Sequence, residues 1–151
     1  MTDGDGWTQC ARGHRHWGRY GAAGLLLVAP GPVVLLQHRA GWSHHGDTWG
    51  IPGGARAKQE SAVQAALREA GEETGLDPDG VVVVRELVDD HGGWAYTTVT
   101  ATAPHQVAVH ALDHESNDVR WVGADAVVEL TLHPGFAATW PMLAEDLPAH
   151  G

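Results

Sequence analysis

The sequence is poor in cysteine, in positive charge and in long apolar runs. Its 151 residues include one cysteine, Cys10, so no disulfide can form within the chain and a reducing cytoplasm is the expected compartment. Nine Lys and Arg against 19 Asp and Glu give a formal net charge of -10, which argues against long nucleic acid as a partner because phosphate binding needs clustered positive charge. No apolar run approaches the ~20 residues of a membrane span, so we expect no membrane partner. The polar start, Met1 to Gly6, has no signal-peptide pattern.

What the sequence contains is enough for one domain. Residues 1–19 are polar and aromatic and are expected to form a loosely ordered lead-in, followed by a domain over residues 20–148. Strands are predicted at Tyr20–Val28, Pro32–His38, Val81–Val88, Trp94–Ala101, Gln106–His110 and Val119–Val122, and helices at 62–74, Ala124–Leu130 and Gly135–Leu147. The turn signal Ala29-Pro30-Gly31 predicts a hairpin between the first two strands. Strands on both sides of a strong central helix predict an α/β fold with a mixed sheet between helices.

The segment 62–74 has the clearest helical signals. Ser61 is predicted to cap its start, with Gln64 completing a capping box, and Gly75 lies just past its end. At 100° per residue, one side of the helix is apolar and forms the predicted core face. That face consists of Val63, Ala66, Leu67 and Ala70.

Three glutamates fall on a different face of this helix. Glu69, Glu72 and Glu73 are neighbours because spacings of three and four residues share a helix face. The remaining members of the face, Ala62 and Ala65, are too small to cover it, so we expect open space there. No Lys or Arg shares the face, and each pair of like charges at ~6 Å repels by roughly 1–3 kcal/mol. Two interpretations follow: a solvated acidic surface, or carboxylates that bind magnesium or manganese.

The residues around the helix decide between these interpretations. They spell G-x5-E-x7-R-E-U-x-E-E-x-G-U, where U is aliphatic, through Gly54, Glu60, Arg68-Glu69-Ala70, Glu72-Glu73, Gly75 and Leu76. This pattern resembles the Nudix box, the signature of the Nudix hydrolases, although Ala70 is small for its position. The preceding stretch from Trp49 to Gly54 resembles the usual lead-in to that box. The resemblance covers nearly the whole chain and implies a Nudix-type α/β/α sandwich.

The resemblance also implies a reaction. Nudix enzymes use magnesium, for which manganese can substitute, to hydrolyse a phosphoanhydride bond of a nucleoside diphosphate linked to another group. Carried over by position, Glu69, Glu72 and Glu73 should bind the metal ion together with the carbonyl of Gly53. Glycine suits that place because it lets the backbone come close to a metal or a phosphate.

Three further roles come from the same resemblance. Glu60 and Arg68 should form an ion pair that joins the loop to the helix. Arg39 matches a position where many relatives have a phosphate-binding arginine. The general base is left open: Glu69 is the first candidate, and Glu115 with Asp118, in the loop before the Val119–Val122 strand, is the second.

The substrate is reached only by elimination. The markers of enzymes acting on ADP-ribose, dinucleoside polyphosphates or coenzyme A are absent, which leaves a nucleoside triphosphate, including an oxidised one, cleaved to the monophosphate and pyrophosphate. The alternative substrates are a nucleotide sugar, another nucleoside diphosphate derivative or a capped RNA end. A further alternative is that the chain is a nucleotide-binding regulator without catalytic activity. Trp42, Trp49 and Trp94 are candidates for base stacking, with packing as their competing role.

Two features are open to a second reading. Cys10, His14 and His16 suggest zinc, because some Nudix relatives carry a zinc ribbon before the domain, but the usual second cysteine is absent and we interpret the segment as a degenerate remnant or plain sequence. A homodimer is compatible with the family, but no residue requires it.

Overall fold

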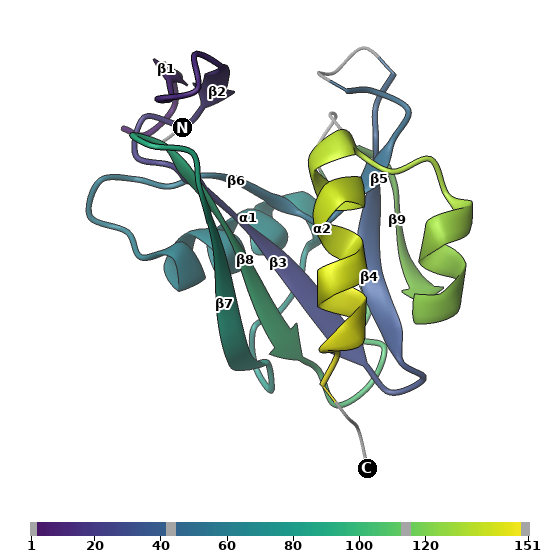
Figure 1. Ribbon diagram of the computed structural model, residues 1–151. Helices are drawn as coiled ribbons and strands as arrows, with labels where there is room; N and C mark the ends of the chain where they lie inside the picture. The colour runs from purple at the N-terminus through teal and green to yellow at the C-terminus, as the bar shows by residue number, and fades with distance from the viewer. Residues whose placement is uncertain (1–2, 42–44, 113–115, 149–151) are drawn as a thin grey trace.

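The computed structural model describes residues 3–41, 45–112 and 116–148, and its centre is a mixed seven-stranded sheet (Figure 1). The strands are β3 (Ala22–Ala29), β4 (Val33–Arg39), β5 (Trp49–Gly50), β6 (Gly53–Ala55), β7 (Val82–Asp90), β8 (Ala95–Thr102) and β9 (Ser116–Gly123). Their order is β5-β4-β3-β8-β7, with β6 also paired to β3 and β9 to β4. β3 and β8 are parallel, and the other pairs are antiparallel.

Helices cover both faces of this sheet. In Figure 1, α1 (Ala62–Thr74) lies behind the sheet, while α2 (Pro134–Glu145) crosses in front of it beside the short 3-10 helix η1 (Ala124–Glu129). The central strand β3 serves both layers, because Leu25 and Leu27 pack in the core with α1 and Leu26 and Val28 pack in the core with α2. All four side chains are fully buried, as expected for a strand covered on two faces. The predicted α/β/α sandwich is confirmed.

The local signals of α1 predicted its bounds correctly. The hydroxyl of Ser61 accepts a hydrogen bond from the Gln64 backbone N–H (3.1 Å), and the Gln64 side-chain oxygen accepts one from the Ser61 backbone N–H (2.8 Å). Gly75 ends the helix in the left-handed region, at φ 71°. The predicted hairpin is also present, with Val28 opposite Val34 in the β3–β4 pair.

The strand predicted at Gln106–His110 was wrong. This segment has no regular secondary structure and pairs with no strand among the described residues. The His110 and Leu112 backbone N–H groups instead donate to the carbonyls of Thr74 (3.0 Å) and Glu73 (2.9 Å), at the end of α1. Its alternating valines, Val107 and Val109, do pack against the core, so the alternation correctly indicated burial. The backbone N–H groups, however, bond to carbonyls at the end of α1 and not to a neighbouring strand. The predicted helix at Ala124–Leu130 is the 3-10 helix η1.

Part of the expected lead-in, residues 7–17, forms a hairpin. β1 (Trp7–Gln9) and β2 (Arg15–Trp17) form a separate two-stranded antiparallel sheet, with the Trp7 and Trp17 rings 5.4 Å apart. The residues before it are tied to the loop after β6, because the Lys58 backbone N–H donates to the Asp3 carboxylate (2.9 Å). Among the described residues, no helix has the length and apolar character needed to cross a membrane.

Candidate active site

Glu73 joins the end of α1 to strand β6. Its carboxylate Oε2 accepts a hydrogen bond of 3.0 Å from the Gly53 backbone N–H. Gly53 lies opposite Gly24 of β3, and a Cβ added at Gly53 would come within 2.5 Å of the Ala23 carbonyl oxygen. Only a glycine lets β6 pass this close to the central strand, which is what brings its backbone to the glutamate.

Glu69 lies against the next residue of β6. Its side chain is only 16% exposed, and a Cβ added at Gly54 would be 2.5 Å from its carboxyl carbon. The glutamate face of the helix is therefore not open as expected. Ala62 and Ala65, which were placed on that face, are buried in the core with the sheet, whereas Glu72 is largely exposed, with 58% of its side chain accessible to solvent.

Arg68 supplies the positive charge that the helix geometry did not predict. Its guanidinium forms two bonds to Glu60 (2.7 and 3.0 Å), which confirms the expected ion pair between loop and helix. The same group contacts a carboxylate oxygen of Glu69 (3.0 Å) and of Glu72 (3.3 Å), and it donates to the Ala55 carbonyl (2.9 Å). The expectation that no arginine offsets the cluster was wrong, because the side chain is long enough to reach across from the flank.

The pKa values record this arrangement of charge. Burial raises the pKa of Glu69, the neighbouring Glu72 and Asp5 add to the rise, and Arg68 opposes it. The pKa of Glu60 is lowered, chiefly by its hydrogen bond to Arg68. The pKa values of these two carboxylates are thus shifted in opposite directions, Glu69 upward and Glu60 downward.

Two groups of this site carry no sequence signal. Tyr96 of β8 has its hydroxyl against Gly24, where an added Cβ would overlap it. Burial raises the pKa of Tyr96, the charge of Glu73 raises it further, and Arg39 lowers it, so the predicted phosphate-binding arginine lies in the same neighbourhood as the end of α1. Asp5 acts on Glu69 from the lead-in. Both come from segments outside the box, and only folding brings them to it.

The tryptophans have structural contacts. Trp49 is half-buried; its ring lies 4.9 Å from the His38 ring, and the Arg120 guanidinium lies 5.7 Å above it. Trp94 stacks on His16 with ring centroids 3.9 Å apart and donates its indole N–H to the Trp17 carbonyl (3.3 Å). Trp42 lies outside the described residues.

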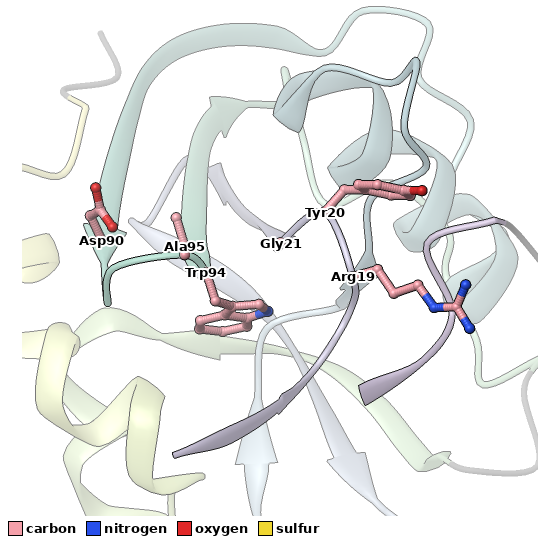
Figure 2. A pocket seen from close by; sticks show the side chains of 7 residues that line it. Arg19, Tyr20, Gly21, Asp90, Trp94 and Ala95 are labelled. Carbon is pink, nitrogen blue, oxygen red and sulfur yellow. The ribbon is translucent and has the colours of Figure 1, made fainter. Parts of the chain in front are cut away.

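A shallow depression of about 280 Å³ lies beside Trp94 (Figure 2). It is lined by Arg19, Tyr20, Gly21, Asp90, Gly93, Trp94 and Ala95. None of the α1 glutamates lines it.

Of the second pair of candidates for the general base, the structure describes only Asp118. Asp118 is engaged on both oxygens, since one accepts from the Val119 backbone N–H (2.8 Å) and the other from the Arg120 guanidinium (2.6 Å). Glu115 lies outside the described residues. Of the candidates that the structure describes, Glu69 is the one beside the other box glutamates.

Comparisons with known proteins show which sequences and structures this chain resembles. The model of a family described as the NUDIX domain matches residues 18–144. A Mycobacterium tuberculosis protein named "Putative 8-oxo-dGTP diphosphatase 3" is 51% identical over 152 residues, which cover 93% of this chain and 69% of that protein. A Bifidobacterium longum nucleoside triphosphate pyrophosphatase/Nudix hydrolase fusion protein is 46% identical over 95% of this chain and 32% of its own length. The crystal structure of RenU, a Nudix hydrolase from M. smegmatis, has a TM-score of 0.88 at 46% identity and covers 98% of this chain and 99% of its own.

Proposed function

Because the chain belongs to the Nudix hydrolase family, we propose that it hydrolyses nucleoside triphosphates, oxidised ones included, to the monophosphate and pyrophosphate. The observation that carries the proposal is the pairing of box glutamates with β6: Glu73 holds Gly53, and Glu69 packs on Gly54. The M. tuberculosis relative, named for 8-oxo-dGTP, supports a triphosphate over other substrates of this family.

The donor set fits a hard divalent cation. Glu69, Glu72 and Glu73 offer carboxylate oxygens, and we propose that they hold Mg²⁺ together with the carbonyl of Gly53, with Mn²⁺ as a substitute. Because Gly54 has no Cβ, the Glu69 carboxylate can lie close to the backbone of β6. When bound, the cation supplies neutralisation of the phosphate charge and a lowered pKa for a coordinated water.

The chain's own residues orient the substrate and move the proton. Arg39 binds a phosphate oxygen, and Trp49 offers an aromatic surface for the base. Glu69 accepts the proton of the attacking water, and the burial that raises its pKa makes it a stronger base than an exposed carboxylate. Arg68 contacts both Glu69 and Glu72, so it holds these carboxylates in position.

A substrate panel tests the proposal. The purified chain is incubated with magnesium and with canonical triphosphates, 8-oxo-dGTP, nucleotide sugars and ADP-ribose, and the products are separated by ion-exchange chromatography. We expect monophosphate and pyrophosphate from at least one triphosphate, and no product in excess chelator. Turnover of nucleotide sugars alone would overturn the triphosphate assignment but keep the family reaction. No turnover of any triphosphate with either cation would also overturn the assignment.

The partner expected is a small nucleotide, and the compartment that we propose is the cytoplasm, where the thiol of Cys10 stays reduced. The homodimer stays a prediction. Light scattering in solution measures it directly.

A further inference from the structure

The β1–β2 hairpin packs on the turn between β7 and β8. The Ala11 backbone N–H donates to the Gly92 carbonyl (2.6 Å), and the Arg12 guanidinium donates to the Asp90 carbonyl (3.3 Å). A Cβ added at Gly92 would be 2.5 Å from that of Ala11, so the two segments are in close contact. Residues far apart in the sequence are therefore brought together beside the hairpin.

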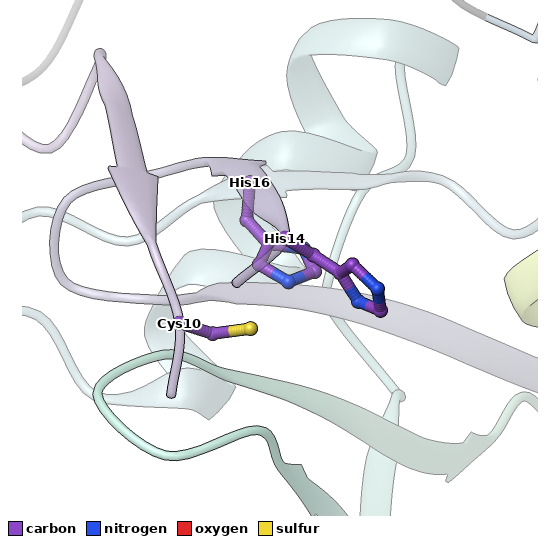
Figure 3. A group of neighbouring side chains, drawn as sticks. All are labelled: Cys10, His14 and His16. Carbon is purple, nitrogen blue, oxygen red and sulfur yellow. The ribbon is translucent and has the colours of Figure 1, made fainter. Parts of the chain in front are cut away.

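The hairpin gathers one thiol and two imidazoles. One ligand atom from each of Cys10, His14 and His16 lies within 4.8 Å of the other two. Figure 3 shows the Cys10 sulfur pointing toward the space beside the two rings. The loop is fixed by its own backbone, because the Cys10 N–H donates to the His14 carbonyl at 2.9 Å. Cys10 is buried and His14 is exposed, so the cluster lies just beneath the surface.

Two buried nitrogens at this place have no hydrogen-bond partner among the described residues. They are Nε2 of His16 and Nδ1 of His91, and the two rings are 4.9 Å apart. Leaving a buried polar atom unsatisfied costs about 1–3 kcal/mol, so two such atoms on neighbouring rings call for a ligand. His91 enters from the β7–β8 turn, which the hairpin contacts through Gly92.

The tautomer of His91 suits a metal. Its Nε2 lies 2.9 Å from the carboxylate of Asp89. An ionised carboxylate only accepts hydrogen bonds, so Nε2 carries the proton and the lone pair of the neutral ring is on Nδ1. A carboxylate behind a histidine in this way is the usual support of a metal-binding imidazole.

We propose that Cys10, His14, His16 and His91 bind a zinc ion, with Asp89 as the positioning residue for His91. A thiolate with imidazoles selects zinc over magnesium, and four ligands complete the tetrahedron of a structural site. The ligand atoms of Cys10, His14 and His16 lie within 4.8 Å of one another, and His91 stands outside that group, next to His16. Ligand bonds of about 2.0–2.3 Å would draw the three atoms together and bring the His91 ring in to join them. The bound ion would fasten the hairpin to the β7–β8 turn.

This proposal revises the sequence interpretation of the segment. The second cysteine of a zinc ribbon is absent, but its place is taken by a histidine from another part of the chain. The site also differs from the box cluster in chemistry, because the box offers only oxygen ligands.

Metal analysis of the full chain tests the proposal. The protein is prepared under reducing conditions, incubated with zinc in excess magnesium, dialysed and measured by mass spectrometry for metals. We expect about one zinc per chain. The variants His14→Ala and His16→Ala should lose it, while His105→Ala, an exposed histidine away from the cluster, should keep it. No zinc in the wild type, or equal zinc in His14→Ala and His16→Ala, would overturn the site.

Cobalt gives a second readout that does not depend on stability. Co²⁺ bound through the thiolate gives a sulfur-to-metal charge-transfer band, which Cys10→Ser should abolish. Asp89→Asn should weaken zinc affinity about 10–100-fold, because the histidine loses the group that fixes its tautomer. Circular dichroism confirms that each variant is folded. Absence of the band in the wild type, or its persistence in Cys10→Ser, would contradict ligation by the thiol.

Discussion

At the scale of the residue, the proposed metal site is tested most directly at Glu73. Glu73→Gln keeps an oxygen that can accept from Gly53, so we expect the fold to survive. The neutral amide is a poor ligand for a divalent cation. Because such a cation contributes several kcal/mol to stabilising the transition state, and each 1.36 kcal/mol is tenfold in rate, kcat should fall about 100–1000-fold. Steady-state kinetics at ordinary magnesium measures this, with Glu145→Gln at the end of α2 as the control.

Gly54 sets the distance between β6 and Glu69. In Gly54→Ala the new Cβ would meet the Glu69 carboxyl group at 2.5–2.7 Å, and Arg68 restrains that group from moving away. A displacement of about 1 Å can cost about 100-fold in rate, so we expect a loss of kcat of roughly 10–100-fold without unfolding.

A matched control lies in the same box. In Gly71→Ala the added Cβ has only an ordinary contact of 3.6 Å with the Leu76 carbonyl oxygen. This variant should stay active and gain about 0.5–1 kcal/mol in the free energy of unfolding, because alanine is the better helix former. Equal losses of kcat in Gly54→Ala and Gly71→Ala would contradict the idea that Gly54 sets the distance between β6 and Glu69.

At the scale of elements, the ion pair between Glu60 and Arg68 ties the loop after β6 to α1. The folded pKa of Glu60 is below its ordinary value of 4.5, so the unfolded chain binds more protons near that pH. The stabilisation is fully present above pH 4.5 and is lost as the pH falls through the folded pKa. Glu60→Gln should therefore be less stable than the wild type at about pH 7, with the gap closing as the pH falls below 4.5 and through the folded pKa. Urea unfolding at several pH values measures the gap, and a gap that widens in acid would refute the role of the pair.

The sequence predicted the elements whose signals are local. The capping box at Ser61, the glycine at 75 and the Ala29-Pro30-Gly31 turn depend on neighbouring residues, and each structure appeared as expected. The segment at 106–110 failed because its valines reveal burial but not what its amides bond to.

For the site, too, the sequence predicted the features that depend on nearby residues and missed the contacts that depend on the whole fold. The box placed the glutamates on one helix, but the contact of Arg68 with Glu69 depends on the reach of a long side chain. Tyr96 and Asp5 come from β8 and the lead-in, and their approach is decided by the packing of the whole sheet.

At the scale of the molecule, the sheet separates two cores, and the box glutamates lie on the side of the core that holds α1. Leu143 of α2 is buried in the layer opposite α1, and Ala66 is buried between α1 and the sheet. Leu143→Ala should cost about 2–5 kcal/mol in the free energy of unfolding, because it leaves a cavity, yet kcat measured well below the melting midpoint should be unchanged. Ala66→Leu should cost about 1–3 kcal/mol and also lower kcat, because overpacking moves α1 away from β6 and separates Glu73 from Gly53. Chemical denaturation and steady-state kinetics on the two variants measure both quantities. If Leu143→Ala lowered kcat as much as Ala66→Leu, the two layers would not be independent, and the site would depend on the whole sandwich rather than on the face that holds α1.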